Sequence, residues 1–149
     1  MGQELLRSWL ADVAARSDFD ASFDEEGVCT LMLDGDIPFS LAVSQEDPDS
    51  FIMAAMVAAL SGEPQSDIAV MEHAMRLNRF QEATMGGTLA LGPASGVISY
   101  ILTHPFASCD SVAFGNLLEH FLNATYRLHR VLVGRRHAER TALVAPSGD

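Results

Sequence analysis

The side chains in this sequence that could do chemistry are five histidines, two cysteines and twenty carboxylates. A zinc site needs cysteine or histidine ligands at close spacing, and Cys29 and Cys109 lie far apart in the chain. His120 directly follows Glu119, so the two side chains point to different sides of a helix. His129 is too distant from either cysteine to form a local motif with it. The residues therefore predict no bound metal and no cofactor.

Nucleotide chemistry is not indicated either, because the sequence holds neither a Walker loop nor a GxGxxG run. The Gly86–Gly87 pair is typical of a strand entry or a bulge, and His104 is expected to end a strand. A Cys–His pair brought together by folding stays open as a catalytic alternative. In that case Cys29 or Cys109 would react with thiol reagents in the folded protein. The remaining features favour a protein that is not an enzyme.

The composition suits a single acidic domain. The chain has 149 residues, 48% of them hydrophobic, and a formal net charge of −11. Binding to a phosphate backbone needs a basic footprint, and an anionic bilayer repels an acidic protein, so we expect neither nucleic acid nor a membrane as partner. The longest apolar run, residues 51–60, is too short to span a bilayer. Two cysteines make no disulfide framework, which favours reduced thiols in the cytosol.

A helix and two paired strands are predicted in the N-terminal part. Apolar residues at helical spacing predict an amphipathic helix over residues 3–16, and the alternation around Phe23 suggests a short strand. The strands over residues 29–33 and 37–43 surround an Asp-Gly pair typical of a two-residue turn. Such a turn would place their apolar residues on opposite faces. A three-residue loop, which pairs Leu33 with Ile37, puts them on one face, so burial selects that register.

The rest of the chain is predicted to contain two helices and a second hairpin. Propensity alone leans slightly toward a helix for residues 51–60, although a strand buried on both faces also fits. A helix capped by Ser66 or Asp67 is expected to reach Asn78, and a helix capped by Asp110 should follow the hairpin. Residues 135–149 carry no apolar stripe, so a flexible Arg-rich tail is expected behind a folded domain of residues 1–134.

The hairpin around residues 87–102 carries apolar side chains on both faces. A four-residue loop pairs Leu91 with Ile98 and Leu89 with Tyr100. Helices can cover one face of such a sheet, and the other face invites a second subunit.

The order of these elements, together with Asn78-Arg79-Phe80 and a hairpin that contains Gly87, Pro93 and Gly96, resembles the class I type III secretion chaperones, the family of the Tir chaperone. The match in element order covers about residues 3–133. The resemblance implies an α+β fold with an antiparallel sheet and three helices in the order α-β-β-β-α-β-β-α. It also implies a strand at residues 51–60, against the local lean toward a helix.

The resemblance further implies a cytoplasmic bacterial chaperone without catalytic activity. Such a protein is a homodimer that binds the N-terminal segment of a secreted effector in extended form and keeps it soluble and competent for secretion. The secretion ATPase is a further candidate partner. The alternative is a regulatory binding protein on the same fold that sequesters a regulator of the secretion system.

Two sets of residues are expected to form the contacts that the resemblance implies. The effector-binding set lies on the first helix and the first hairpin and consists of Leu6, Trp9, Leu31, Leu33, Phe39 and Leu41. The dimer-interface set consists of Met71, Met75, Phe80, Leu89, Ala90 and Leu91. Trp9 is expected to be the most anchor-like of the first set, because large aromatic side chains dominate such contacts. The alternative is that the six effector-binding residues simply pack on one another as core.

Overall fold

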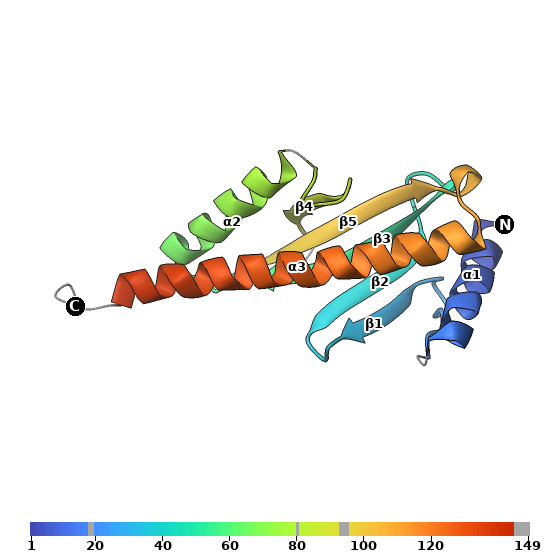
Figure 1. Ribbon diagram of the computed structural model, residues 1–149, viewed down its shortest axis with the longest axis horizontal. Helices are drawn as coiled ribbons and strands as arrows, with labels where there is room; N and C mark the ends of the chain where they lie inside the picture. Colours follow the sequence, from blue (N-terminus) through green and yellow to red (C-terminus); the bar gives the residue numbers. More distant parts are fainter. Residues whose placement is uncertain (18–19, 80, 93–95, 145–149) are drawn as a thin grey trace. The chain divides into compact units, whose positions relative to one another are not determined.

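The computed structural model describes the backbone of residues 1–17, 20–79, 81–92 and 96–144, and the side chains among them up to residue 134. In chain order the elements are α1 (Gly2–Arg16), β1 (Cys29–Leu33), β2 (Ile37–Val43), β3 (Ser50–Ala59), α2 (Pro64–Asn78), β4 (Thr88–Leu91), β5 (Val97–Pro105), a 3-10 turn (Phe106–Ser108) and α3 (Ser111–Val144) (Figure 1). This order confirms the predicted α+β class and the predicted succession of helices and strands.

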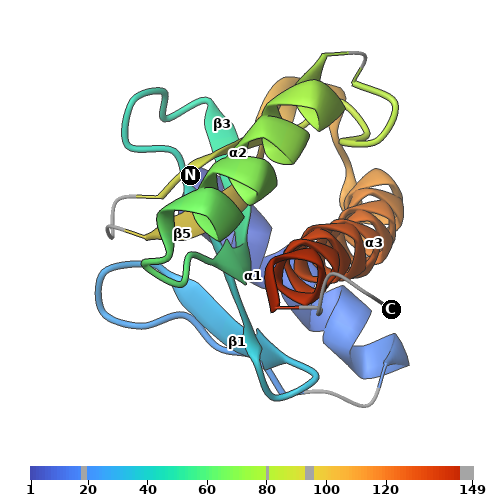
Figure 2. The ribbon, with the colours of Figure 1, turned by 90° about the vertical axis from the view of Figure 1, so that its left-hand side faces the viewer.

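The five strands form one sheet in the order β1-β2-β3-β5-β4. β1 lies at one edge of the sheet, next to β2 (Figure 2). The chain forms two compact units. Unit 1 comprises Met1–Ala55 with Ile101–Asn123, and unit 2 comprises Met56–Tyr100 with Ala124–Asp149.

The first hairpin of unit 1 has the predicted register, with Leu33 opposite Ile37 and Cys29 opposite Leu41. Its turn nevertheless combines both geometries that the sequence offered. Asp34 and Gly35 have φ of 51° and 81°, and the Asp36 N–H donates to the Leu33 carbonyl at 3.1 Å, as in a two-residue turn. Asp36 is then an extra, bulged residue, and this bulge restores the register that burial requires.

The strand that the family resemblance implied at residues 51–60 is confirmed, against the local lean toward a helix. Residues 51–59 lie in β3, which pairs with β2 and is buried along most of its length. Two other local expectations needed correction. The segment expected as a short strand makes a single bridge, between Phe23 and Cys29. α2 begins at Pro64, ahead of the expected cap, because proline suits the first helical position. The Asp67 carboxylate instead accepts the N–H groups of Ser61 and Gly62, both at 2.8 Å.

Aromatic side chains form the centre of unit 1. Trp9 of α1 lies 6.1 Å from the ring of Phe51, 5.8 Å from Phe106 and 5.6 Å from Phe114, measured between ring centroids. Phe51 contacts Phe114 as well, at 5.7 Å. These contacts join one helix, one strand and the start of α3 to a single face of the sheet. They therefore fix α1 in place through its tryptophan.

In unit 2, polar groups fasten α2 to β4. The Asn78 side chain accepts the Leu89 N–H and donates to the Leu89 carbonyl, both at 2.8 Å. The Tyr100 hydroxyl donates to the Thr84 carbonyl in the loop before β4. The Gly92 N–H donates to the Val97 carbonyl at 2.8 Å, as the predicted register of the second hairpin requires. Residues 93–95 of its loop lie outside the described residues.

α3 begins as predicted, with the Asp110 carboxylate accepting the Ala113 N–H at 2.8 Å. It continues to Val144 and so runs past Gly134, where we expected the folded domain to end. The flexibility of residues 135–149 stays a prediction.

Trp9→Ala should lower the free energy of unfolding by about 3–5 kcal/mol, because it removes a buried indole that contacts three other rings. Chemical denaturation followed by circular dichroism would measure this. Leu5→Ala is the matched control on the same helix, since Leu5 is 37% exposed, and should cost less than about 1 kcal/mol. Equal stability of the Trp9 variant and the parent chain would contradict the packing described above.

Candidate functional site

The titratable groups of the described residues do not assemble into a reaction centre. No group of three or more His, Cys, Asp or Glu side chains within those residues is arranged to hold a metal ion. The structure also holds no helix in its described part that could cross a bilayer. The predictions that the protein binds no cofactor and is not an enzyme stay predictions.

Both cysteines are free thiols. Burial raises the pKa of the Cys29 thiol, and the nearby Asp24 carboxylate raises it further. Burial and Asp110 act in the same direction on the pKa of Cys109. A raised pKa reduces the thiolate fraction at neutral pH, and the thiolate is the nucleophilic form. Neither cysteine is therefore activated in the way that a catalytic thiol requires.

The six residues expected to bind an effector divide by burial. Leu6, Trp9, Phe39 and Leu41 are buried in the core of unit 1. In this conformation those four side chains have almost no surface for a partner to contact. Leu31 and Leu33, on the edge strand β1, are half-buried. An effector-binding role stays a prediction for the whole set, and these two residues are its accessible members.

The backbone of β1 offers hydrogen-bonding groups that no other strand of the described residues takes up. The Leu33 carbonyl faces β2, since it accepts the Asp36 N–H. Backbone groups alternate in direction along a strand, so the N–H and C=O of Met32 point away from β2. The bridge between Phe23 and Cys29 covers only the first part of this edge. At Met32, whose side chain is 57% exposed, the edge is open to an added strand.

The residues expected at a dimer interface lie on α2 and β4 of unit 2. Met75 and Leu91 are 73% and 62% exposed. Met71 and Ala90 are half-buried, and Leu89 is buried. Phe80 lies outside the described residues.

Sequence reasoning missed three exposed apolar residues. Ile68 is 50% exposed and shares its helical stripe with Met71 and Met75, a spacing that could have placed it in the interface set. Met85 is 48% exposed and has φ of 52°, and no pattern in the sequence signals that position. The exposure of Met32 could have been predicted, because side chains alternate between the two faces of a strand and Leu31 and Leu33 were assigned to the buried face.

A sequence profile decides the family. The profile of the Tir chaperone protein (CesT) family matches residues 8–129, which is most of the chain. The chain belongs to the Tir chaperone family. The resemblance stated from its sequence is thus confirmed. A comparison with curated protein sequences found no match.

Several solved structures share the Tir chaperone fold of this chain. A chain of the HopA1–SchA chaperone–effector complex is 18% identical, with a TM-score of 0.65 over 92% of this chain and 97% of that one. A chain of the ExsC–ExsE complex is 18% identical, with a TM-score of 0.63 over 99% and 98%. A chain of the heterodimeric ExoU–SpcU complex of the Pseudomonas aeruginosa type III secretion system is 13% identical, with a TM-score of 0.56 over 86% and 94%. At these identities the likeness establishes the fold.

Cysteine reactivity should follow the raised pKa values. At neutral pH a thiol reagent such as Ellman's reagent should modify Cys109 more slowly than free cysteine, and the rate should rise with pH to a midpoint above that of free cysteine. Cys29 should react only on unfolding, because it is fully buried. Cys29→Ser isolates the Cys109 signal and serves as the control. A thiol that reacts faster than free cysteine at pH 7 would instead favour the enzymatic alternative.

Proposed function

We propose that this protein is a cytoplasmic bacterial type III secretion chaperone. It binds the N-terminal segment of a secreted effector in extended form and thereby keeps the segment soluble before export. Family membership supports the class of function, and the open edge of β1 at Met32 is the observation that carries the binding mode. An extended chain added to this edge gains main-chain hydrogen bonds, while its side chains gain contacts with Leu31 and Leu33. The secretion ATPase remains a candidate second partner.

Site-directed crosslinking in the native host tests this proposal. A photo-crosslinking amino acid in place of Met32 should capture one protein, and mass spectrometry should place the crosslink in the N-terminal segment of a secreted protein. The matched control carries the same group in place of Val112, a residue of unit 1 that is 66% exposed on α3. We expect at least about tenfold less capture there, because α3 offers no open strand edge.

The identity of the captured protein separates the two candidate functions. A regulator of the secretion system crosslinked at Met32 would favour the alternative, a sequestering protein on the same fold. Equal capture at Met32 and Val112 would remove the β1 edge from the mechanism.

We also propose a homodimer joined through α2 and β4. The exposed apolar side chains of Ile68, Met75 and Leu91 support this interface, because side chains of this size at such exposure are uncommon on a monomer when they gather on neighbouring elements. A two-fold interface uses the same patch on both subunits, so any change in the patch acts twice.

Leu91→Asp should convert the dimer into a folded monomer. Light scattering after size-exclusion chromatography should give the 16.1 kDa of one chain for the variant and twice that mass for the parent. Val112→Asp changes a similarly exposed residue of unit 1, which is part of neither α2 nor β4, and should leave the dimer intact. A parent chain that is monomeric at micromolar concentration would refute the interface.

A further inference from the structure

In unit 1, the register of the strands divides the sheet into two faces with different surroundings. Phe39 and Phe51 lie on one face, where α1 and the start of α3 cover it through Trp9, Phe114 and Phe121. The residues that alternate with this set along each strand point to the opposite side. We call that side the outer face. Across the strands it consists of Met32 opposite Pro38, of Thr30, Ser40 and Ala54 in one row, and of Ala42 opposite Ile52.

The outer face carries small or apolar side chains and no charge. Thr30 and Met32 are exposed, and the other five residues are half-buried. A sheet face that only meets water usually alternates to polar residues. Both helices of unit 1 contribute their ring contacts to the other face. The outer face of this unit is therefore largely apolar surface without a helix of unit 1 over it.

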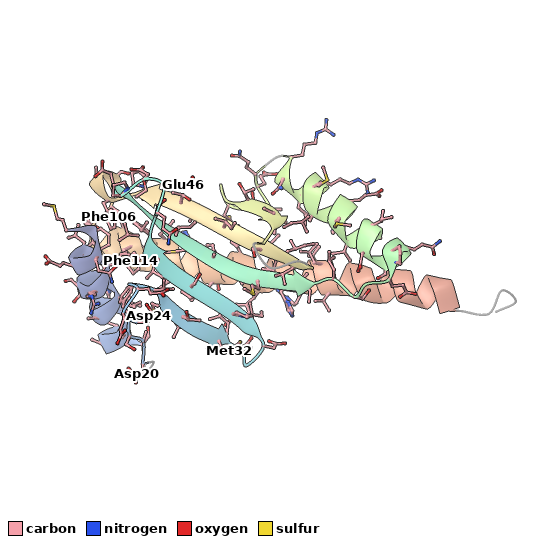
Figure 3. The ribbon with its side chains drawn as sticks, turned by 180° about the vertical axis from the view of Figure 1, so that it is seen from behind. Asp20, Asp24, Met32, Glu46, Phe106 and Phe114 are labelled. Carbon is pink, nitrogen blue, oxygen red and sulfur yellow. The ribbon has the colours of Figure 1, made fainter. Side chains whose placement is uncertain are left out.

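Acidic turns stand at both ends of the outer face. Asp34 and Asp36 lie in the turn between β1 and β2, and Glu46 lies in the turn between β2 and β3. Met32 is near the first of these ends, and Asp24 and Glu46 are at the other (Figure 3). Residues 20–55 contain nine acidic residues and no Arg or Lys. Asp24 and Asp47 accept backbone N–H groups of their own turns, while Asp34, Asp36 and Glu46 are exposed.

We propose that the outer face binds an extended client segment whose middle is apolar and whose two ends are basic. This inference rests on the proposed chaperone function and adds the chemistry of the client. Apolar contact holds the middle of the segment, and the acidic turns attract its ends. β2 has seven residues, which span about 23 Å at about 3.3 Å per residue. The basic residues of the client should therefore stand about seven or eight positions apart.

A second copy of the chain is a poorer occupant for this face. It would bring acidic turns against acidic turns, and like charges at an interface oppose association. The apolar surface of α2 and β4, by contrast, includes the oppositely charged pair Glu72–Arg76 on α2, at 3.8 Å. The charge distribution thus assigns the outer face to a basic partner.

Two synthetic peptides serve as probes. Both are about twelve residues long with a central run of alternating valine and serine; one has two arginines at each end, and the other has two serines. Fluorescence anisotropy should show tighter binding of the arginine peptide, by about fivefold or more at low salt. The difference should disappear at about 0.5 M salt, because exposed charges are then screened.

Charge-neutralising variants locate the effect. Asp34→Asn with Asp36→Asn should weaken binding of the arginine peptide about three- to tenfold at low salt and leave the serine peptide unchanged. Asparagine tolerates the positive φ of residue 34, so the turn is kept. Glu4→Gln with Glu119→Gln removes the same charge from exposed helix positions and should change binding less than about twofold.

Each other result overturns the inference. Equal affinity for the two peptides, no binding of either, or equal weakening by the control variant would show that the acidic turns do not select a basic client. A Met32→Asp variant that changes the oligomeric mass would make the outer face a contact between copies of the chain. Capture through residue 32 of a client without paired basic residues would leave the chaperone function standing and refute this inference alone.

Discussion

The pairing register of β1 and β2 is the constraint on which the rest of unit 1 depends. Side chains alternate between the two faces of a sheet, so a slip by one residue would exchange core and surface along the whole strand. The bulge at Asp36 makes a tight turn compatible with Leu33 lying opposite Ile37. Only in this register do Phe39 and Leu41 join the buried face. Continued through β2 to β3, it also brings Phe51 to the tryptophan of α1.

The same register leaves polar and apolar groups available at the surface. The backbone of Met32 faces away from β2, and the side chains of Ala42, Ala54 and Ile52 line a face without a helix of unit 1 over it. In unit 2 the edge strand is β4, and outward backbone groups of this strand are hydrogen-bonded by a side chain. There Asn78 occupies both outward backbone groups of Leu89, so that part of β4 cannot pair with another chain. The two edges of the sheet are thus closed to different extents by specific side chains.

Secondary structure with a strict hydrophobic period could be predicted from the sequence. The solvent exposure of individual apolar side chains could not. The register of the first hairpin followed from the alternation of Leu31, Leu33 and Phe39, because a wrong register is penalised by burial. Residues 51–60 are apolar on every side, so periodicity could not distinguish strand from helix, and only the family resemblance indicated the strand. The start of α2 was placed too late because the capping residue was inferred without the proline before it.

The sequence could not show which apolar side chains are buried in the core and which stay accessible to a partner. Trp9 and Leu31 both lie on apolar faces, yet Trp9 is enclosed by three rings and Leu31 stands at the edge of the sheet. That difference arises from chain segments far apart in sequence. β3, the 3-10 turn after β5 and α3 reach Trp9 and leave β1 uncovered on one side. The local sequence pattern does not indicate which distant segment packs on a residue. The candidate site was therefore predicted less well than the fold.

An open strand edge beside an apolar face carries a risk, because such surfaces also promote self-association and aggregation. The net charge of −11, with acidic residues at both ends of the outer face, opposes that outcome by repulsion between copies of the chain. The same charges attract a segment of opposite sign. One arrangement of carboxylates therefore disfavours the wrong partner, another copy of the chain at this face, and favours a basic client.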